Sequence, residues 1–266
     1  MKLLKGTAWK PISRDQYRTL AETLSKGREW EYCSFTEKLL RPRSSTTVLS
    51  LENNFIMQDR TGFVFPIITS EQFGDLRLSY QPRSIMGLAN NVTQFCDAAR
   101  IQPATVIHYT LMVRKPAPVT LHRREIPLVR RLSPEDFLDV LPLETAYQQE
   151  EVMLPGQPLH EESVHLHVHT MLQQQRGTGV FHGKHLMAKA HTNARGLQCH
   201  QIGGVYTLPE YRSSGWANLA MRALLIELGS HRSFTSLFVK NGNTAGQKLY
   251  RRLGFTPTGE YTIAYT

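Results

Sequence analysis

No apolar run in the 266-residue sequence approaches the ~20 residues that a helix needs to cross a bilayer. The first ten residues include lysines but lack the apolar stretch and small-residue cleavage site of a secretory signal. Cysteine is scarce too, and Cys33, Cys96 and Cys199 are scattered, which argues against a disulfide framework or a paired-cysteine zinc site. We therefore expect a cytoplasmic protein with no membrane partner and with cysteines that are ordinary core residues.

The composition is that of a globular protein, with 41% hydrophobic and 20% charged residues. The length exceeds one typical domain, so two domains are expected. The net charge of +9 indicates an anionic partner, which could be a cofactor, an acidic substrate or nucleic acid. Nucleic acid is the least favoured, because the basic pairs Arg123-Arg124 and Arg130-Arg131 are as easily solvated and no reading motif accompanies them.

The first half of the sequence predicts an α+β unit. Ser13 and Gln16 form a capping-box pair at the start of a helix that Gly27 ends. Turn sequences separate β-rich runs, and Lys115-Pro116-Ala117-Pro118 forms a stiff linker, so we place a domain boundary there, between 1–118 and 119–266. The elements expected in this half are a helix at 14–26, strands at 46–51, 55–58 and 63–68, a helix at 84–99 and a strand at 106–113.

The second half predicts a second α+β unit. Ser133 followed by Pro134 begins a helix, and Asn243 and Gly254 cap and end the last one. The expected elements are a strand at 128–132, helices at 134–148 and 163–175, two strands flanking 182–184, a strand at 198–207, a helix from Pro209 to Gly229, a strand at 236–240, a helix at 243–253 and a strand at 261–265 that closes the sheet.

The segment from Gly204 to Ala217 is a strand that ends in a turn and runs directly into a helix. The first N–H groups of that helix have no partner within it and lie at the positive end of its dipole, so they can hold a pyrophosphate largely by main chain. Gly215 and Ala217 keep the approach open, and Arg212 adds a positive charge. The segment is therefore a candidate phosphate site.

Two short motifs resemble a known family. Arg212, Gly215 and Ala217 fit the pattern Arg/Gln-x-x-Gly-x-Gly/Ala, and the downstream Asn243-Thr244-Ala245, Leu249-Tyr250 and Gly254-Phe255 fit a second signature. The C-terminal half thus resembles the GNAT superfamily of acetyl-CoA-dependent N-acetyltransferases. The resemblance implies a mixed, mostly antiparallel central sheet flanked by helices. The N-terminal half is compatible with a degenerate copy of that fold, and it could cover the substrate cleft, recognise a partner or support a homodimer.

The resemblance implies transfer of an acetyl group from acetyl-CoA to a primary amine of a small molecule, peptide or protein, by direct attack in a ternary complex. The strand at 205–207 would separate from that at 237–239 to admit the pantetheine arm, with Gly203-Gly204 either forming a bulge there or accommodating a neighbouring side chain. The implied cofactor-binding residues are Val205, Tyr206, Thr207, Arg212, Ser213, Ser214, Gly215, Trp216, Ala217 and Asn243.

Among the implied catalytic residues, Tyr250 is the acid that protonates the departing thiolate. Many relatives carry a glutamate base where this sequence has Gln201, which cannot take a proton but could hold a water. The ultimate acceptor would then be His200, Glu144, Glu150 or Glu151, with Glu150 and Glu151 on the substrate-side loop. The missing glutamate leaves a second hypothesis, a non-catalytic acyl-CoA-binding regulatory module.

Eight of the eleven histidines lie between His160 and His200. His165 and His169 would share one helix face, which raises the possibility of a zinc site. No HExxH pattern, cysteine pair or third ligand at suitable spacing accompanies them. We therefore expect no metal and interpret these histidines as surface or substrate-side residues.

Overall fold

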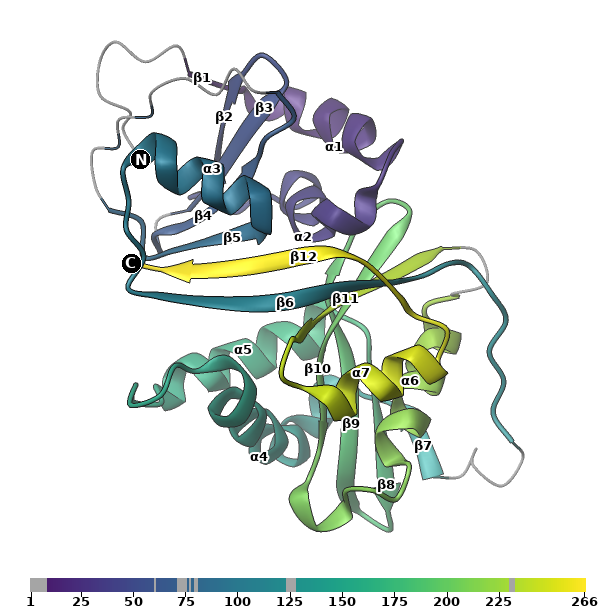
Figure 1. Ribbon diagram of the computed structural model, residues 1–266. Helices are drawn as coiled ribbons and strands as arrows, with labels where there is room; N and C mark the ends of the chain where they lie inside the picture. Colours follow the sequence, from purple (N-terminus) through teal and green to yellow (C-terminus); the bar gives the residue numbers. More distant parts are fainter. Residues whose placement is uncertain are drawn as a thin grey trace.

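The computed structural model describes residues 9–59, 61–70, 76, 78, 81–122, 128–229 and 233–266. Within this part of the chain the strands form one continuous 12-stranded sheet, with helices of each half packed against it (Figure 1). No helix among these residues is long and apolar enough to cross a membrane.

The strands of the first half are β1 (Lys10–Pro11), β2 (Thr47–Leu51), β3 (Asn54–Gln58), β4 (Phe63–Ile67), β5 (Ser84–Leu88) and β6 (Thr105–Arg114). Those of the second half are β7 (Val129–Arg131), β8 (Gly177–His182), β9 (His185–Arg195), β10 (Cys199–Thr207), β11 (Phe234–Lys240) and β12 (Thr256–Tyr265).

The helices of the first half are α1 (Tyr17–Ser25), α2 (Glu29–Leu40) and α3 (Ala89–Ala99). Those of the second half are α4 (Phe137–Tyr147), α5 (Glu161–Gln174), α6 (Trp216–Glu227) and α7 (Thr244–Arg252). Short turns precede α1 (η1, Arg14–Gln16) and α4 (η3, Pro134–Asp136), a π-helical turn follows α4 (η4, Gln148–Val152), and a 3₁₀ turn follows β10 (η5, Pro209–Tyr211).

The strand order is symmetric about the middle of the sheet. It is β1-β2-β3-β4-β5-β12-β6-β11-β10-β9-β8-β7, so β1 at one edge corresponds to β7 at the other, and each further strand of the first half corresponds to the strand numbered six higher. Both halves also contain one parallel pair, β4 with β5 and β10 with β11. Even the helix starts match, because Ser13 N donates to Gln16 and Ser133 N donates to Asp136. The N-terminal half is therefore a second copy of the C-terminal fold, an arrangement with which the sequence was compatible.

The two halves exchange their last strands. The C-terminal strand β12 lies between β5 and β6 of the first half, and β6 pairs with β11 of the second. The segment Tyr261–Tyr265 was expected to be the strand that closes the sheet. It is instead part of β12 in the middle of the sheet, where β12 lies side by side with β6 along its whole length (Figure 1). The sheet thus crosses the boundary placed at 118 without interruption, and the division into 1–118 and 119–266 stays a prediction.

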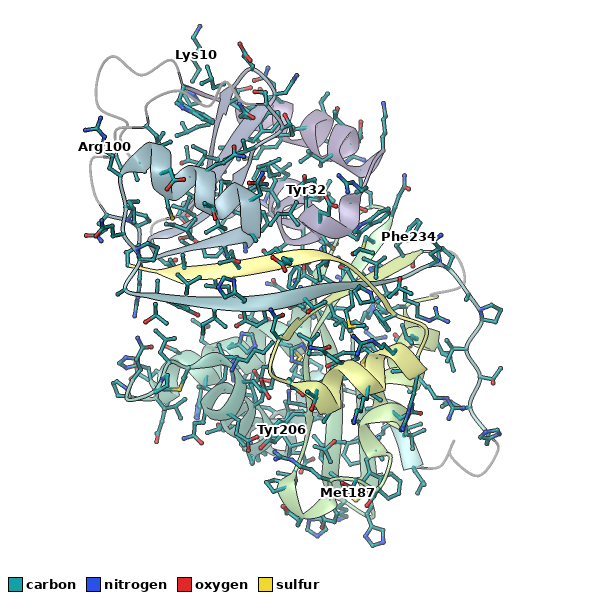
Figure 2. All side chains as sticks on the ribbon, viewed as in Figure 1. Lys10, Tyr32, Arg100, Met187, Tyr206 and Phe234 are labelled. Atoms are coloured by element: carbon teal, nitrogen blue, oxygen red, sulfur yellow. The ribbon has the colours of Figure 1, made fainter. Side chains whose placement is uncertain are left out.

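Two elements of the first half differ from expectation. Residues 84–88 were predicted as part of a helix but form β5, because Ile85 is buried in the core and every residue of the run pairs with β12. Helix α2 was missed. It buries Glu29 and Glu31 as well as Phe35, and its backbone is kinked at Tyr32 (labelled in Figure 2), so its apolar residues do not form a simple helical stripe.

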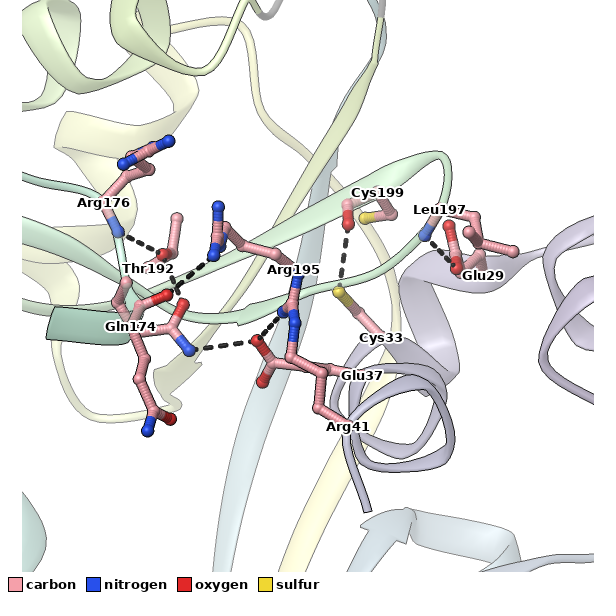
Figure 3. A network of polar contacts seen from close by, with 11 residues as sticks. Glu29, Cys33, Glu37, Arg41, Gln174, Arg176, Thr192, Arg195, Leu197 and Cys199 are labelled. Carbon is pink, nitrogen blue, oxygen red and sulfur yellow. Dashed lines mark hydrogen bonds and ion pairs between the residues drawn. The ribbon is translucent and has the colours of Figure 1, made fainter. Parts of the chain in front are cut away.

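Helix α2 joins the halves by clamping the turn between β9 and β10 (Figure 3). The carboxylate of Glu29, 2% exposed, accepts the backbone N–H groups of Leu197 at 2.8 Å and Gln198 at 2.5 Å. One turn further along α2, Cys33 Sγ donates to Cys199 O at 3.2 Å. One turn beyond that, Glu37 accepts a hydrogen bond from Gln175 Nε2 at 3.0 Å. All three cysteines are buried and free, as expected.

We expect Glu29→Ala to lower the free energy of unfolding by about 2–3 kcal/mol, because two hydrogen bonds to a buried carboxylate are lost. Urea denaturation followed by circular dichroism measures it. The matched control is Glu22→Ala, which removes an exposed pair with Arg18 and should cost only about 0.5 kcal/mol or less. Equal losses for the two variants would contradict the clamp.

Candidate functional site

Strands β10 and β11 separate partway along their length. They pair in parallel only where Cys199 to Ile202 meets Phe234 to Leu237, although β10 continues to Thr207 and β11 to Lys240. The separation begins at a bulge: between Gly203 and Tyr206, β10 holds one residue more than β9, and Gly204 has a φ of 56°. The glycine pair makes the bulge and also accommodates a neighbour, because a Cβ on Gly204 would collide with the His191 ring.

The loop after β10 leads into α6 through two residues with left-handed backbone, Ser213 with a φ of 63° and Gly215 with a φ of 83°. A Cβ built on Gly215 would meet no atom within 4 Å, so the space in front of the helix start is open. The first N–H groups of the twelve-residue helix α6 have no partner within the helix and lie at the positive end of its dipole. A helix start of this kind can bind an anion.

Arg212 of this loop is held by Glu150. Its guanidinium lies 2.7 Å from Glu150 Oε2, and Glu150 Oε1 accepts from Tyr206 OH at 2.6 Å. The hydrogen bond from Tyr206, followed by that from Arg212, lowers the pKa of Glu150. Burial, with the neighbouring Glu150 charge, raises the pKa of Tyr206 to about 12. Glu150 is therefore an ionised partner of the loop.

A cavity of about 230 Å³ occupies the gap between the separated strands. Gln201 and Val205 of β10 line it together with Tyr250 of α7, and Glu151 also lines it. The first half contributes Ser34, Met86 and Tyr109, and Ser34 Oγ donates to Gln201 Oε1 at 3.1 Å. The structure thus brings Tyr250, Gln201, Glu151 and Asn243 together around one space, while Glu150 points into the loop.

The start of α7 organises one wall of this cavity. The side-chain oxygen of Asn243 accepts the Gly246 N–H at 2.8 Å, and its amide nitrogen donates to Glu151 Oε1 at 3.3 Å. Lys240 Nζ lies 3.6 Å from the other oxygen of Glu151. Burial, and secondarily the Glu151 charge, raises the pKa of Tyr250, so its phenol is protonated and can donate at neutral pH.

Comparison with known families adds the decisive observation: residues 143–255 match the acetyltransferase (GNAT) family. These residues form a GNAT domain. Comparison with curated proteins finds no match. Among solved structures, a protein from Drosophila is similar at a TM-score of 0.71 and 12% identity, covering 98% of this chain and 99% of that one. An acetyltransferase of the GNAT family from Colwellia psychrerythraea gives 0.60 and 10%, covering 97% and 99%. At such identities these likenesses show the fold alone, here along nearly the whole chain.

The corresponding gap in the first half is closed. Strands β4 and β5 also pair in parallel for only two residues, yet a Cβ added to Gly87 would lie 3.4 Å from Pro66 O and 3.7 Å from Val92. Asn91, 3% exposed, donates to Pro66 O at 3.4 Å and fills the same region. Among the described residues of that half there is no counterpart of the left-handed loop at 213–215. As far as the structure describes the first half, the arrangement around the GNAT domain's cavity is therefore not repeated there.

A second cavity, of about 250 Å³, lies between α2 of the first half and α5 of the GNAT domain. Asn193 lines both cavities, so the two adjoin at this residue. The walls of the second cavity include the polar side chains of Glu37, Lys38, Arg41 and His167 beside apolar ones such as Met57 and Phe63. Residues of both halves line each of the two cavities.

Sequence reasoning missed a buried cluster beneath the bulge. Lys189 Nζ of β9 lies 2.6 Å from Glu144 Oε2 of α4, and both side chains are 0% exposed. His191 Nε2 and His167 Nε2 each lie 3.4 Å from a Glu144 oxygen. The one signal in the sequence is a lysine inside the apolar run Leu186 to Ala190, because a buried lysine requires a buried partner.

Burial and neighbouring charges together set the pKa values of Glu144 and His191. Burial would raise the pKa of Glu144, but the Lys189 charge and the hydrogen bonds with His167 and His191 outweigh it and hold that pKa well below its ordinary value. Burial, with the Lys189 charge, lowers the pKa of His191. At neutral pH, Glu144 is therefore ionised and His191 neutral.

The histidines paired in the sequence do not converge on a metal position. His165 and His169 both lie against Phe137, with ring centroids 5.7 Å and 4.1 Å from it. The group that does converge is Glu144, His167 and His191, whose ligand atoms lie within 4.8 Å of one another. Its donor set suits zinc, but the Lys189 ammonium at Glu144 opposes a dication. Of the basic pairs, Arg130 binds Asp136 within its own half, and Arg123 and Arg124 lie outside the described residues.

We expect one equivalent of Zn²⁺ to leave the thermal unfolding midpoint unchanged, because Lys189 already neutralises Glu144. Differential scanning fluorimetry with and without EDTA measures it, and His167→Ala, which removes one of the three ligands, is the matched control. A rise of several degrees that saturates at one equivalent and is lost in His167→Ala would show a zinc site instead.

Proposed function

We propose that the protein transfers an acetyl group from acetyl-CoA to a primary amine by direct attack in a ternary complex. The single observation that carries the proposal is the open gap between β10 and β11, which begins at the Gly204 bulge, contains Tyr250 and lies beside the anion-binding turn. The match of residues 143–255 to the GNAT family supports it.

In this proposal the pyrophosphate of acetyl-CoA occupies the concavity formed by Ser213, Ser214, Gly215, Trp216 and Ala217. Arg212 exchanges its partner Glu150 for the phosphates, since both are anionic. The pantetheine arm lies in the gap along the main chain of Val205, Tyr206 and Thr207, and Asn243 contacts the cofactor from the start of α7. Tyr206 contributes main chain only, because its side chain is 5% exposed and packs away from the gap.

The chemical step needs two proton transfers. The amine nitrogen attacks the thioester carbonyl carbon, the carbon–sulfur bond breaks, and the thiolate takes the phenolic proton of Tyr250. The proton of the amine must leave through a base. We favour Glu151 over Glu150, because Glu151 lines the cavity whereas Glu150 is engaged by Arg212 and Tyr206. Gln201, fixed by Ser34, would hold the water that connects amine and carboxylate.

For the N-terminal half we propose a role in enclosing the acceptor. Ser34, Met86 and Tyr109 already line the transfer cavity, and α2 forms a wall of the adjoining one. The exchanged strand β12 places Tyr261 and Tyr265 in the same lining. If the division at 118 separates two domains, the acceptor site lies between them.

The second candidate is a non-catalytic acyl-CoA-binding module, favoured by one observation: Gln201 is buried at 2% exposure and bound to Ser34 where a base is needed. Such a module would bind acetyl-CoA in the same gap. It would release no thiol in the presence of amines, which separates the two proposals experimentally.

We expect acetyl-CoA and a panel of amines to give thiol release, measured with a thiol reagent, and Tyr250→Phe to lower kcat by roughly 100-fold or more, the range for a general acid. Its Kd for acetyl-CoA should change little, because only a proton donor is lost. The matched control, Tyr32→Phe, removes a hydroxyl outside the cavity and should retain activity. Tight binding with no thiol release for any amine would favour the regulatory module.

A further inference from the structure

Resting on the proposed function, we propose that Lys189 and Glu144 are positioning residues for acetyl transfer. Their buried ion pair holds the Gly204 carbonyl and thereby aims the Val205 N–H at the thioester.

The carbonyl of Gly204 is bound by a side chain. Lys189 Nζ donates to Gly204 O at 2.9 Å and to Glu144 Oε2 at 2.6 Å. A bulge removes its residues from the regular ladder, so the carbonyl needs a donor from elsewhere. A lysine reaching across from β9 supplies one, and Glu144 from α4 supplies the opposite charge that pairs with this buried lysine.

The hydrogen bond fixes a direction as well as a position. In a trans peptide the C=O and the following N–H point in opposite directions. With Gly204 O held by the Lys189 ammonium, the Val205 N–H points away from that ammonium and from its partner Glu144. Val205 lines the cavity that opens where β10 and β11 have separated, and neither Lys189 nor Glu144 does. In this proposal the N–H is therefore directed into the gap in which the thioester is proposed to lie.

The surroundings keep this peptide from relaxing. His191 packs against Gly204 so closely that no Cβ fits, and its Nδ1 lies 3.1 Å from Thr192 O. The Tyr147 ring covers Lys189, with the ammonium 5.0 Å from its centroid. On the other side of the carboxylate, Gln148 Nε2 donates to Glu144 Oε1 at 2.8 Å. A donor pre-aimed in this way stabilises developing negative charge without reorganising during the reaction.

Neither Lys189 nor Glu144 is offered as the base. Glu144 stays ionised because its pKa is held low by Lys189, and neither side chain lines the transfer cavity. Lys189 and Glu144 act on the reaction through the main chain at Gly204 and Val205. Their replacement should therefore change kcat and the proton signal of the Val205 amide.

The test replaces both charges with methionine, because removing one alone would strand the other in the interior and threaten folding. We compare Lys189→Met/Glu144→Met with the control Lys184→Met/Glu162→Met, which removes the same two charge types at exposed positions. The first readout is steady-state kinetics with acetyl-CoA. We expect kcat to fall by about 10- to 100-fold, approaching the loss of one oxyanion donor, with KM for acetyl-CoA within about threefold of wild type.

The second readout is the Val205 amide in ¹⁵N-valine-labelled protein, assigned through Val205→Ile. In wild type and control its proton signal should move downfield on adding acetyl-CoA, and the double variant should lose most of that shift while its thermal midpoint stays within a few degrees. A folded double variant that keeps both the shift and kcat would overturn the proposal. If wild type shows the shift but no turnover, the proposed function fails while the positioning role stands.

Discussion

The separation of β10 from β11 is the constraint on which the rest of the site depends. Parallel strands that stayed paired would leave no space for a ligand between them. The bulge at Gly203-Gly204 ends the pairing, and its carbonyl is satisfied by Lys189 instead of by a neighbouring strand. A charged pair buried at 0% exposure is costly, and replacing such pairs with apolar residues is often neutral or stabilising. Here the buried pair supplies the hydrogen-bond donor for the Gly204 carbonyl of the bulge, which explains why a charged pair is present at this position.

The exchange of β6 and β12 is what brings the first half to the cavity. Each half lends its last strand to the other, so Tyr109 of β6 and Tyr261 of β12 face the space between the separated strands. Helix α2 adds Ser34 to the same space and clamps the β9–β10 turn through Glu29. Among the described residues, the gap is open in the second copy of the fold and closed in the first. In the first copy Asn91 and Val92 occupy the equivalent position, and that half instead lines both cavities.

The sequence predicted the local features well. Short sequence patterns predict features that depend on residues close together in the chain. These include the turn at 212–217, the cap at Asn243 and most strands. The sequence did not predict the middle position of β12, because which strand a terminal segment joins is decided by distant partners. Glu144 and Lys189 lie 45 residues apart, so their pairing leaves no local pattern. Helix α2 escaped notice because it buries two glutamates: Glu29 binds the β9–β10 turn, and Glu31 pairs with Arg28 at the start of the same helix.

The most direct test of the central claim is a crystal structure of the protein with CoA bound. It should show the pantetheine arm between β10 and β11 beyond Ile202 and Leu237, with the pyrophosphate on the N–H groups of Ser213 to Ala217 and Arg212 turned from Glu150 to the phosphates. CoA bound elsewhere, with the gap closed or empty and Arg212 still on Glu150, would contradict the account.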